Sequence, residues 1–186
     1  MAIATRVLTL EEFLTLPEEE PSLEFVDGEV TQKVSPQGQH GILQFEIARL
    51  LDSLARPGKL ARVIPELRST YARASTVPDI SVYRWERIPV LSSGKAANRF
   101  FDPPDIAVEI VSPEQSTNAL LRRCLWYVAN GVQIALLVDP DDESVVLFRP
   151  DRAPVALRGG DRIDLDEMLP GSEFTADTIF ETLLMT

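Results

Sequence analysis

The residues of this sequence best suited to chemistry are two carboxylates inside apolar runs. Glu109 lies within the run of residues 106–111, and Asp79 directly precedes Ile80. A buried carboxylate without a partner is costly, so each must be protonated, paired or bound to a cation. If the two runs form neighbouring strands, the side chains converge at one end of a sheet and form an oxygen site for a hard cation such as Mg²⁺. The alternative is structural, with Glu109 paired to an arginine and Asp79 capping a turn.

Residue counts exclude most other kinds of catalytic site. The chain has one cysteine, Cys124, and one histidine, His40. A single cysteine forms neither an internal disulfide nor a cysteine-based zinc site, and a single histidine removes His-rich metal sites and most Ser-His triads. Cys124 lies among apolar residues, which favours a core position over a nucleophile. Any catalysis is therefore expected to rest on carboxylates.

Charge is distributed unevenly along the chain. The formal net charge is −11, from 18 basic and 29 acidic residues, which argues against coating nucleic acid by bulk electrostatics. Residues 49–99 nevertheless hold ten basic and four acidic residues, a balance of +6, so the remainder carries −17. This central stretch is either a phosphate-facing surface or a set of solvated loops and strand edges.

Length and composition indicate one globular domain. The chain has 186 residues, of which 45% are hydrophobic and 25% charged. Its apolar runs are all far shorter than the ~20 residues of a membrane span, and residues 1–6 lack the apolar core of a secretory signal. We therefore expect no membrane association and a cytoplasmic location.

The first third of the chain predicts a short helix, a hairpin and a longer helix. Thr9 is a candidate cap for a helix that ends before Pro17. Asp27-Gly28 is the strongest hairpin signal and centres a hairpin over residues 23–34. Apolar residues recur with helical period over residues 40–56, before Pro57-Gly58.

The rest of the chain reads as strands around a βαβ unit. Strands are expected at residues 59–65, 66–73 and 77–83, followed by a long loop at 85–103. A strand at 104–111, a helix at 116–130 and a strand at 132–138 make the βαβ unit, whose nearly continuous apolar strands are typical of a parallel pair covered on both faces. Antiparallel strands at 144–149 and 155–158 and a helix at 175–185 complete the reading.

The long loop carries two adjacent aromatic residues, Phe100 and Phe101, close to Arg99 and Lys95. This combination offers faces on which bases stack and charges that hold phosphates, as in single-strand binders. The alternative is a hydrophobic anchor for the loop.

Several short segments occur in the order and spacing of one known family. They are residues 24–29, His40 at the start of a helix, Pro78-Asp79, residues 108–113, Tyr127 with residues 130–132, and residues 138–140. In these segments the chain resembles the Uma2 family, long called a domain of unknown function and similar to PD-(D/E)XK nucleases of the restriction-endonuclease-like fold. The match covers about residues 8–184.

The resemblance implies an α/β (α+β) fold with a restriction-endonuclease-like core, in which helices flank a central mixed sheet. The core is a helix, three mostly antiparallel strands, a helix and a strand. A single domain spans residues 1–186, with an N-terminal helix and hairpin at about 8–34, the core at about 38–139 and C-terminal strands and a helix at about 140–186. The implied activity is metal-dependent hydrolysis of DNA phosphodiester bonds, with Mg²⁺ or Mn²⁺ as cofactor, DNA as partner and a homodimer as the assembly.

The resemblance also assigns site residues. Asp79 and Glu109 become metal ligands, and the backbone carbonyl of Ile110 completes the site. Glu24 matches a characteristic family acid and adds a ligand directly or through water. His40 matches a family position, where a capping or packing role is as well supported as a catalytic one.

The sequence departs from the family pattern at the lysine. The position two residues after Glu109 is Val111, and the Uma2 position fourteen residues after Glu109 is Arg123, with Arg122 beside it. Arginine stabilises charge on a phosphate but does not take a proton from water. Two alternatives to an active nuclease follow: a weakened or inactive nucleic-acid-binding or regulatory module, and a protein-interaction domain that the charge of −11 favours.

Overall fold

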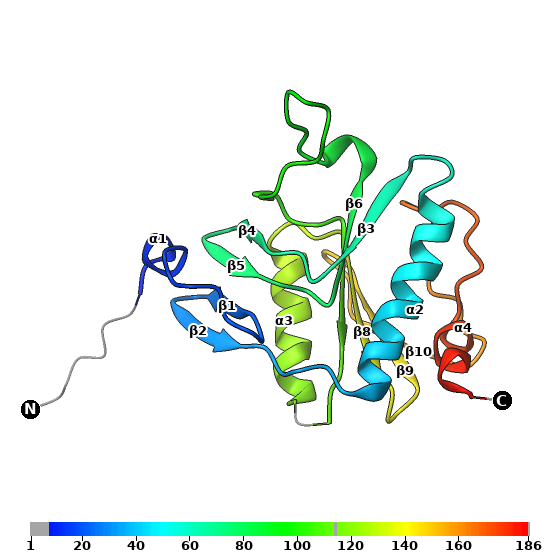
Figure 1. The fold of residues 1–186 in the computed structure, drawn as a ribbon. Coiled ribbons are helices and arrows are strands. Elements are labelled where there is room, and N and C mark those ends of the chain that lie inside the picture. Colours follow the sequence, from blue (N-terminus) through cyan, green and yellow to red (C-terminus); the bar gives the residue numbers. More distant parts are fainter. Residues whose placement is uncertain (1–7, 114, 186) are drawn as a thin grey trace, which may run out of the picture.

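The computed structural model describes residues 8–113 and 115–185. Residues 1–6, on which the absence of a secretory signal was predicted, lie outside this range. Six strands form a large mixed sheet in the order β10-β9-β8-β7-β6-β3 (Figure 1). Their bounds are β3 Ala61–Pro65, β6 Ile80–Arg84, β7 Ile106–Ile110, β8 Ile134–Asp139, β9 Ser144–Phe148 and β10 Val155–Arg158.

The predicted βαβ unit is confirmed. Strands β7 and β8 pair in parallel, and α3 (Thr117–Ala129) connects them. On the other side of β7, strand β6 pairs with β7 in antiparallel fashion, and β3 pairs with β6 in the same way. Strands β9 and β10 extend the sheet in antiparallel fashion, as expected. The expected order of helix, three antiparallel strands, helix and parallel strand is therefore present.

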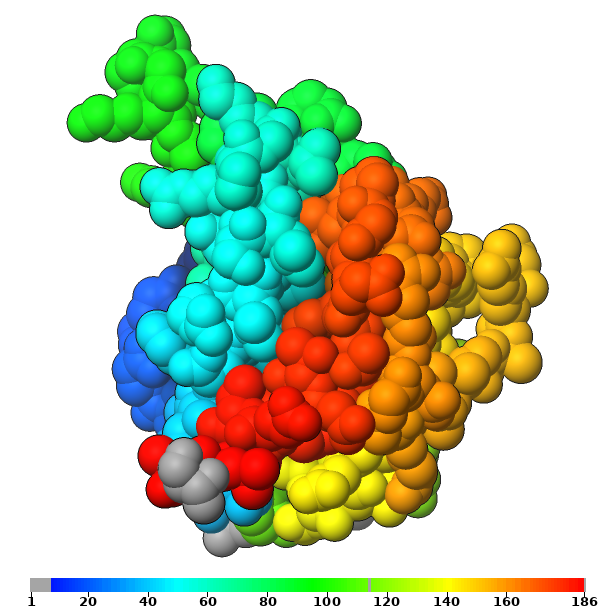
Figure 2. All heavy atoms as spheres, turned by 90° about the vertical axis from the view of Figure 1, so that its right-hand side faces the viewer, coloured from blue at the N-terminus to red at the C-terminus, as the bar shows by residue number. Residues whose placement is uncertain are grey.

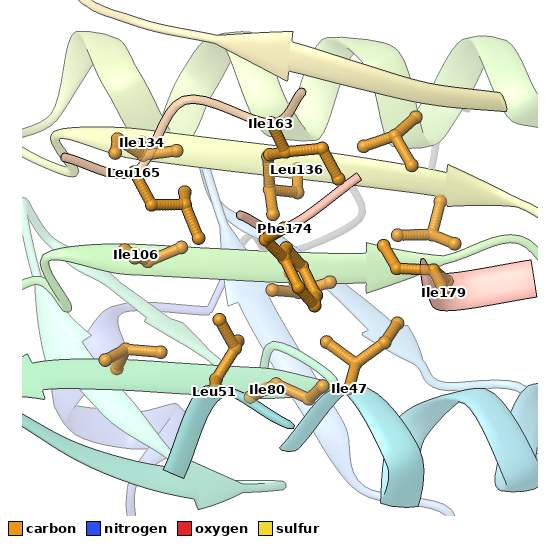
Figure 3. Close-up of a cluster of buried hydrophobic side chains, with 14 of the residues drawn as sticks. Ile47, Leu51, Ile80, Ile106, Ile134, Leu136, Ile163, Leu165, Phe174 and Ile179 are labelled. Carbon is orange, nitrogen blue, oxygen red and sulfur yellow. The ribbon is translucent and has the colours of Figure 1, made fainter. Parts of the chain in front are cut away.

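Helices cover both faces of the large sheet. The face opposite α3 carries α2 (Gly38–Ala55), whose side chains at every fourth position, Leu43, Ile47, Leu51 and Ala55, are fully buried. Figure 3 shows Ile47 and Leu51 beside Ile80 of the sheet, in a cluster that also contains Ile106 and side chains of the C-terminal segment. This segment contains α4 (Ala176–Phe180) and the 3₁₀ turn η2 (Glu181–Leu183), and it lies along α2 in Figure 2. The predicted C-terminal helix is therefore present but shorter than residues 175–185.

A second, smaller sheet was not predicted. Its order is β2-β1-β5-β4, and it joins the hairpin β1 (Leu23–Val26) and β2 (Glu29–Gln32) to β4 (Ser69–Tyr71) and β5 (Ala74–Thr76). The expectation of one strand over residues 66–73 is wrong, because the chain turns at Ala72 and Arg73, which both have positive φ (47° and 60°). Such turns normally carry Asn or Gly, and neither is present to signal this one. The strand expected at 77–83 begins only at Ile80.

The N-terminal predictions are confirmed. Thr9 and Glu12 form a capping box for α1 (Leu10–Phe13). Asp27 and Gly28 both have positive φ, 52° and 86°, as a tight two-residue hairpin turn requires. The ring of Phe13 stacks on that of Phe25 at 5.4 Å and attaches α1 to the hairpin.

The segment between β6 and β7 begins with the 3₁₀ turn η1 (Trp85–Arg87) and is otherwise the expected long loop. It rises above β4 in Figure 1 and is joined to that strand by a bridge between Ser69 and Phe100. None of the helices in the part of the chain that the structure describes is long and apolar enough to cross a membrane.

Candidate active site

The two carboxylates singled out in the sequence meet on one face of the large sheet. Strand β7 alternates, so that Val108 and Ile110 contribute to the core beneath α2, whereas Glu109 points to the α3 side. Ile80 pairs with Val108 across β6 and β7, which places Asp79, one residue earlier, opposite Glu109. Asp79 is 2% exposed and Glu109 is 4% exposed. The expectation that both carboxylates are buried on neighbouring strands is confirmed.

Asp79 is held by donors on both oxygens. The backbone N–H of Ile110 donates to Oδ2 at 2.8 Å, and Lys33 Nζ donates to Oδ1 at 2.7 Å. His40 Nε2 lies 3.5 Å from the same Oδ1. Burial alone would raise the pKa of Asp79, but the hydrogen bonds and charges of His40 and Lys33 outweigh it and hold this pKa below its ordinary value. Asp79 is therefore the ionised member of the pair.

Glu109 has the opposite electrostatic character. Burial and the charge of Asp79 raise its pKa to about 8, against the smaller opposing effects of Arg123 and Lys33. The hydroxyl of Tyr127, on α3, donates to Glu109 Oε1 at 2.5 Å. The other oxygen, Oε2, accepts no hydrogen bond from the described residues. A cation placed between the two carboxylates would relieve this repulsion.

Lys33 belongs to the site and was missed in the sequence. It follows β2 and donates to Glu66 and to the backbone oxygen of Val77, both at 2.9 Å, in addition to Asp79. Its side chain is only 10% exposed. The neighbouring carboxylates hold the pKa of Lys33 above its ordinary value, although burial acts against them. One signal was available: Lys33 is among only three lysines in the chain and lies in the hairpin that carries Glu24.

Glu24 and Arg123 form a tie between the hairpin and α3. Glu24 Oε1 accepts the backbone N–H of Val77 at 2.7 Å, and its Oε2 forms a short hydrogen bond with Arg123 Nη1. Burial lowers the pKa of Arg123, but electrostatic interactions with Tyr127, Glu24 and Glu109 outweigh it and raise this pKa overall. Both oxygens of Glu24 are engaged in this tie. The adjacent Arg122 is exposed, so Arg123 is the arginine that faces the site.

The remaining candidates from the sequence are buried among residues that hold them in place. His40 is buried, and its Nδ1 lies 2.8 Å from Ser112 Oγ while its other nitrogen faces Asp79. The side chain of Ile110 lies in the core, and its backbone faces the site. Cys124 is fully buried among apolar side chains, which confirms a core role.

The basic stretch of residues 49–99 is largely used in internal pairs. Five of its members form ion pairs within the chain, namely Arg49, Arg56, Arg68, Arg84 and Arg87. Two more, Lys59 and Arg62, lie about 6 Å from the ring centre of Trp85. Most of this stretch therefore does not form a continuous surface of unpaired positive charge.

A second buried aspartate precedes β7. Asp105 is 2% exposed and accepts the backbone N–H of Arg84 at 2.8 Å. The guanidinium of Arg87 lies 2.7 Å from Asp105 Oδ1, and that of Arg84 lies 3.5 Å from the same atom. Asp105 thus has two cationic partners and a backbone donor.

Comparison with known proteins agrees with this geometry. A family model for Uma2, described as "Putative restriction endonuclease", matches residues 10–177. A solved structure from Anabaena variabilis ATCC 29413, described as "a putative nuclease belonging to DUF820", is 36% identical and superposes with a TM-score of 0.92. The match covers 95% of this chain and 99% of that one. None of the curated proteins matches. With the family model matching most of its length and a 36% identical relative sharing its whole fold, the chain belongs to the Uma2 family.

Proposed function

We propose that this protein is a metal-dependent endonuclease that hydrolyses phosphodiester bonds of DNA, with a site of the PD-(D/E)XK type. The observation that carries the proposal is the buried pair Asp79 and Glu109, in which Asp79 contributes to a Glu109 pKa of about 8. Two acids held together in a low-dielectric site are a common arrangement where a protein binds a cation or moves protons. The description of the family and of its solved member as nucleases supports the same conclusion.

The donor atoms fit Mg²⁺ or Mn²⁺. Asp79, Glu109 and the backbone carbonyl of Ile110 would hold the ion, and all three supply the oxygen ligands that hard cations prefer. The described residues contain no group of three or more His, Cys, Asp or Glu side chains placed to hold a metal, so we propose that a backbone oxygen and water molecules join the two carboxylates. When bound, such an ion lowers the pKa of a water molecule and neutralises charge on the phosphate.

The other side chains of the site position the pair and supply positive charge. Tyr127 fixes Glu109 through its hydroxyl, and the N–H of Ile110 fixes Asp79. Lys33 brings an ammonium group to the carboxylates, so the site has a lysine even though α3 carries Arg123 at the family position. We propose that Lys33 and Arg123 stabilise the negative charge that develops on the phosphate, with Glu24 holding Arg123 in place.

A second candidate function is a nuclease-fold module that binds nucleic acid without cutting it. One observation favours it: Asp79 Oδ1 is already in contact with Lys33 Nζ at 2.7 Å, and its Oδ2 with a backbone N–H. A metal ion would have to share Asp79 with Lys33. Metal binding without hydrolysis would therefore distinguish this candidate from the nuclease.

The test is cleavage of supercoiled and single-stranded DNA with Mg²⁺ or Mn²⁺. Asp79→Ala and Glu109→Ala are compared with wild type and with Glu86→Ala, which removes an exposed carboxylate of η1 and controls for the loss of an acid outside the site. The two site variants, purified in the same way, control for contaminating nuclease. We expect cutting to disappear in the first two variants only, and Arg123→Lys to cut faster than wild type. No cutting by wild type, with Mn²⁺ binding still detected by calorimetry, would replace the proposal with the binding module. The homodimer and the cytoplasmic location stay predictions.

A further inference from the structure

A cavity of about 380 Å³ opens beside the candidate active site, and no role described above uses it. It lies between the segment that follows α1, strand β4 and the loop that precedes β7. Its lining includes Glu66, Arg68, Thr70, Arg99, Phe100 and Phe101. Glu66 also accepts a hydrogen bond from Lys33, which in turn contacts Asp79. Lys33 therefore connects a lining residue of the cavity to the carboxylate pair.

The two aromatic residues of the loop have different environments. Phe100 is 4% exposed, packs against Tyr83 at a ring distance of 4.9 Å and accepts the backbone N–H of Thr70 at 3.0 Å. On the other side, the Tyr83 hydroxyl donates to the backbone oxygen of Asp102 at 2.9 Å. Phe101, between these two anchored residues, is 63% exposed. Phe100 is thus the hydrophobic anchor, whereas Phe101 presents an aromatic face to solvent on a fixed backbone.

Among the described residues that line the cavity, one cation, Arg99, has no acidic partner. Glu18 pairs with Arg68 at 3.4 Å, and Glu66 pairs with Lys33 at 2.9 Å. Arg99, by contrast, makes no ion pair or side-chain hydrogen bond with any described residue. An exposed guanidinium two residues from an exposed aromatic ring provides a phosphate contact beside a stacking face.

We propose that this cavity binds an unpaired base of the nucleic-acid substrate, with Phe101 stacking on the base and Arg99 contacting a phosphate beside it. The inference rests on the proposed function and adds a substrate class, single-stranded or locally unpaired DNA. A paired base hides both faces within the stack, so only an unpaired or flipped-out base offers a face to Phe101. The cavity volume lies within the roughly 300–1,000 Å³ of small-ligand pockets.

The first test measures affinity by fluorescence anisotropy of a labelled 12-nucleotide oligo(dT) and of a short hairpin duplex. Ca²⁺ replaces Mg²⁺, and gels confirm that the oligonucleotides stay intact. Phe101→Ala is compared with Phe45→Ala, because Phe45 on α2 is equally exposed, at 64%, and does not line the cavity. We expect Phe101→Ala to weaken single-strand binding about ten-fold, the size of one stacking contact, and to change duplex binding less than about two-fold. Phe45→Ala should leave both affinities unchanged.

Two further variants examine the arginine and the stacking itself. Arg99→Gln should weaken single-strand binding and lower the slope of log affinity against log salt by about one, whereas Lys95→Gln, on the same loop, should not. Phe101→Trp should restore binding, and the fluorescence of the introduced indole should be quenched by the oligonucleotide. The same indole in Phe45→Trp should not be quenched.

Equal single-strand affinity of Phe101→Ala and Phe45→Ala overturns the proposal, and so does an equal loss on single strand and duplex. If DNA cleavage still depends on Asp79 in that case, the base subsite alone has failed. If wild type neither binds nor cuts either oligonucleotide, the proposed function has failed and the subsite with it.

Discussion

The chain contains the dipeptide Pro-Asp twice, as Pro78-Asp79 before β6 and Pro104-Asp105 before β7. Both aspartates are 2% exposed. Because β6 and β7 are antiparallel, the two dipeptides lie at opposite ends of the strand pair. Each aspartate therefore lies beside the last residues of the neighbouring strand, Asp79 beside Glu109 and Ile110 and Asp105 beside Arg84.

The facing residue makes the two ends chemically different. At the end of β6, Asp105 meets Arg84 and the adjacent Arg87, so one acid has two cations. At the end of β7, Asp79 meets Glu109, so two acids face each other and draw Lys33 toward them. The acid at the first end is fully compensated by cations, whereas the second end retains repulsion between two acids that a bound cation can relieve. A buried aspartate at a strand end therefore indicates a candidate cation site only when the residue beside it is also known.

The largest expected difference between the two ends is in cleavage. Asp79→Asn should lower the rate of DNA nicking by more than about 100-fold, the size of effect seen when one key electrostatic group is lost. Asp105→Asn should stay within about three-fold of wild type at a temperature where the variant is folded. If both folded variants lost the same fraction of the nicking rate, the difference between the two strand ends would have no bearing on cleavage.

The free energy of unfolding should fall more in Asp105→Asn than in Asp79→Asn, which reverses the order expected for cleavage. Asp105→Asn leaves two arginines facing a neutral group, and we expect it to lower the free energy of unfolding by about 2–3 kcal/mol, since both arginines are about one-third exposed. Asp79→Asn should cost less, because it removes the repulsion with Glu109 while Lys33 keeps Glu66 as a partner. Urea unfolding of both variants at pH 7 in EDTA measures the difference. A larger loss of stability in Asp79→Asn than in Asp105→Asn would contradict this expected order.

The dependence of stability on pH should arise mainly from the Asp79 end. The pKa of Glu109 rises from 4.5 to about 8 on folding, so between these values the native state binds a proton that the unfolded state has lost. The contribution of Glu109 to stability is therefore full below pH 4.5 and falls as the pH rises to 8. Between pH 5.5 and 8, wild type should lose on the order of 2 kcal/mol more than Glu109→Gln in metal-free buffer. Asp105→Asn should keep the wild-type slope, and a parallel Glu109→Gln curve would locate the titration elsewhere.

The smallest effects should come from the tyrosine near each end. Tyr127→Phe removes the hydroxyl hydrogen bond to Glu109, and Tyr83→Phe removes those to Ser69 and to the backbone of Asp102, so each should cost about 1–2 kcal/mol of stability. Only Tyr127→Phe should slow cleavage, by about ten-fold or less, because only Tyr127 contacts the carboxylate pair. A matching loss in Tyr83→Phe would instead indicate a general effect of packing.

The large sheet and its carboxylate pair could be predicted because their signals are local. Apolar runs indicate β7 and β8, and Glu109 stands out because an acid interrupts such a run. Lys33 gives no comparable signal, since its partner Asp79 lies 46 positions away and periodicity does not tell where a hairpin docks. The small sheet escaped for a related reason: Ala72 and Arg73 adopt a turn conformation that their residue types do not announce.

The tie between Glu24 and Arg123 joins positions 99 residues apart, and this separation matters during synthesis. The hairpin is synthesised well before Arg123, and β7 gains its parallel neighbour only when residue 139 has been made. A nascent chain therefore carries the acids of the site long before it can assemble them. If the protein cuts nucleic acid as proposed, it gains this activity only after Arg123 and β8 have been translated.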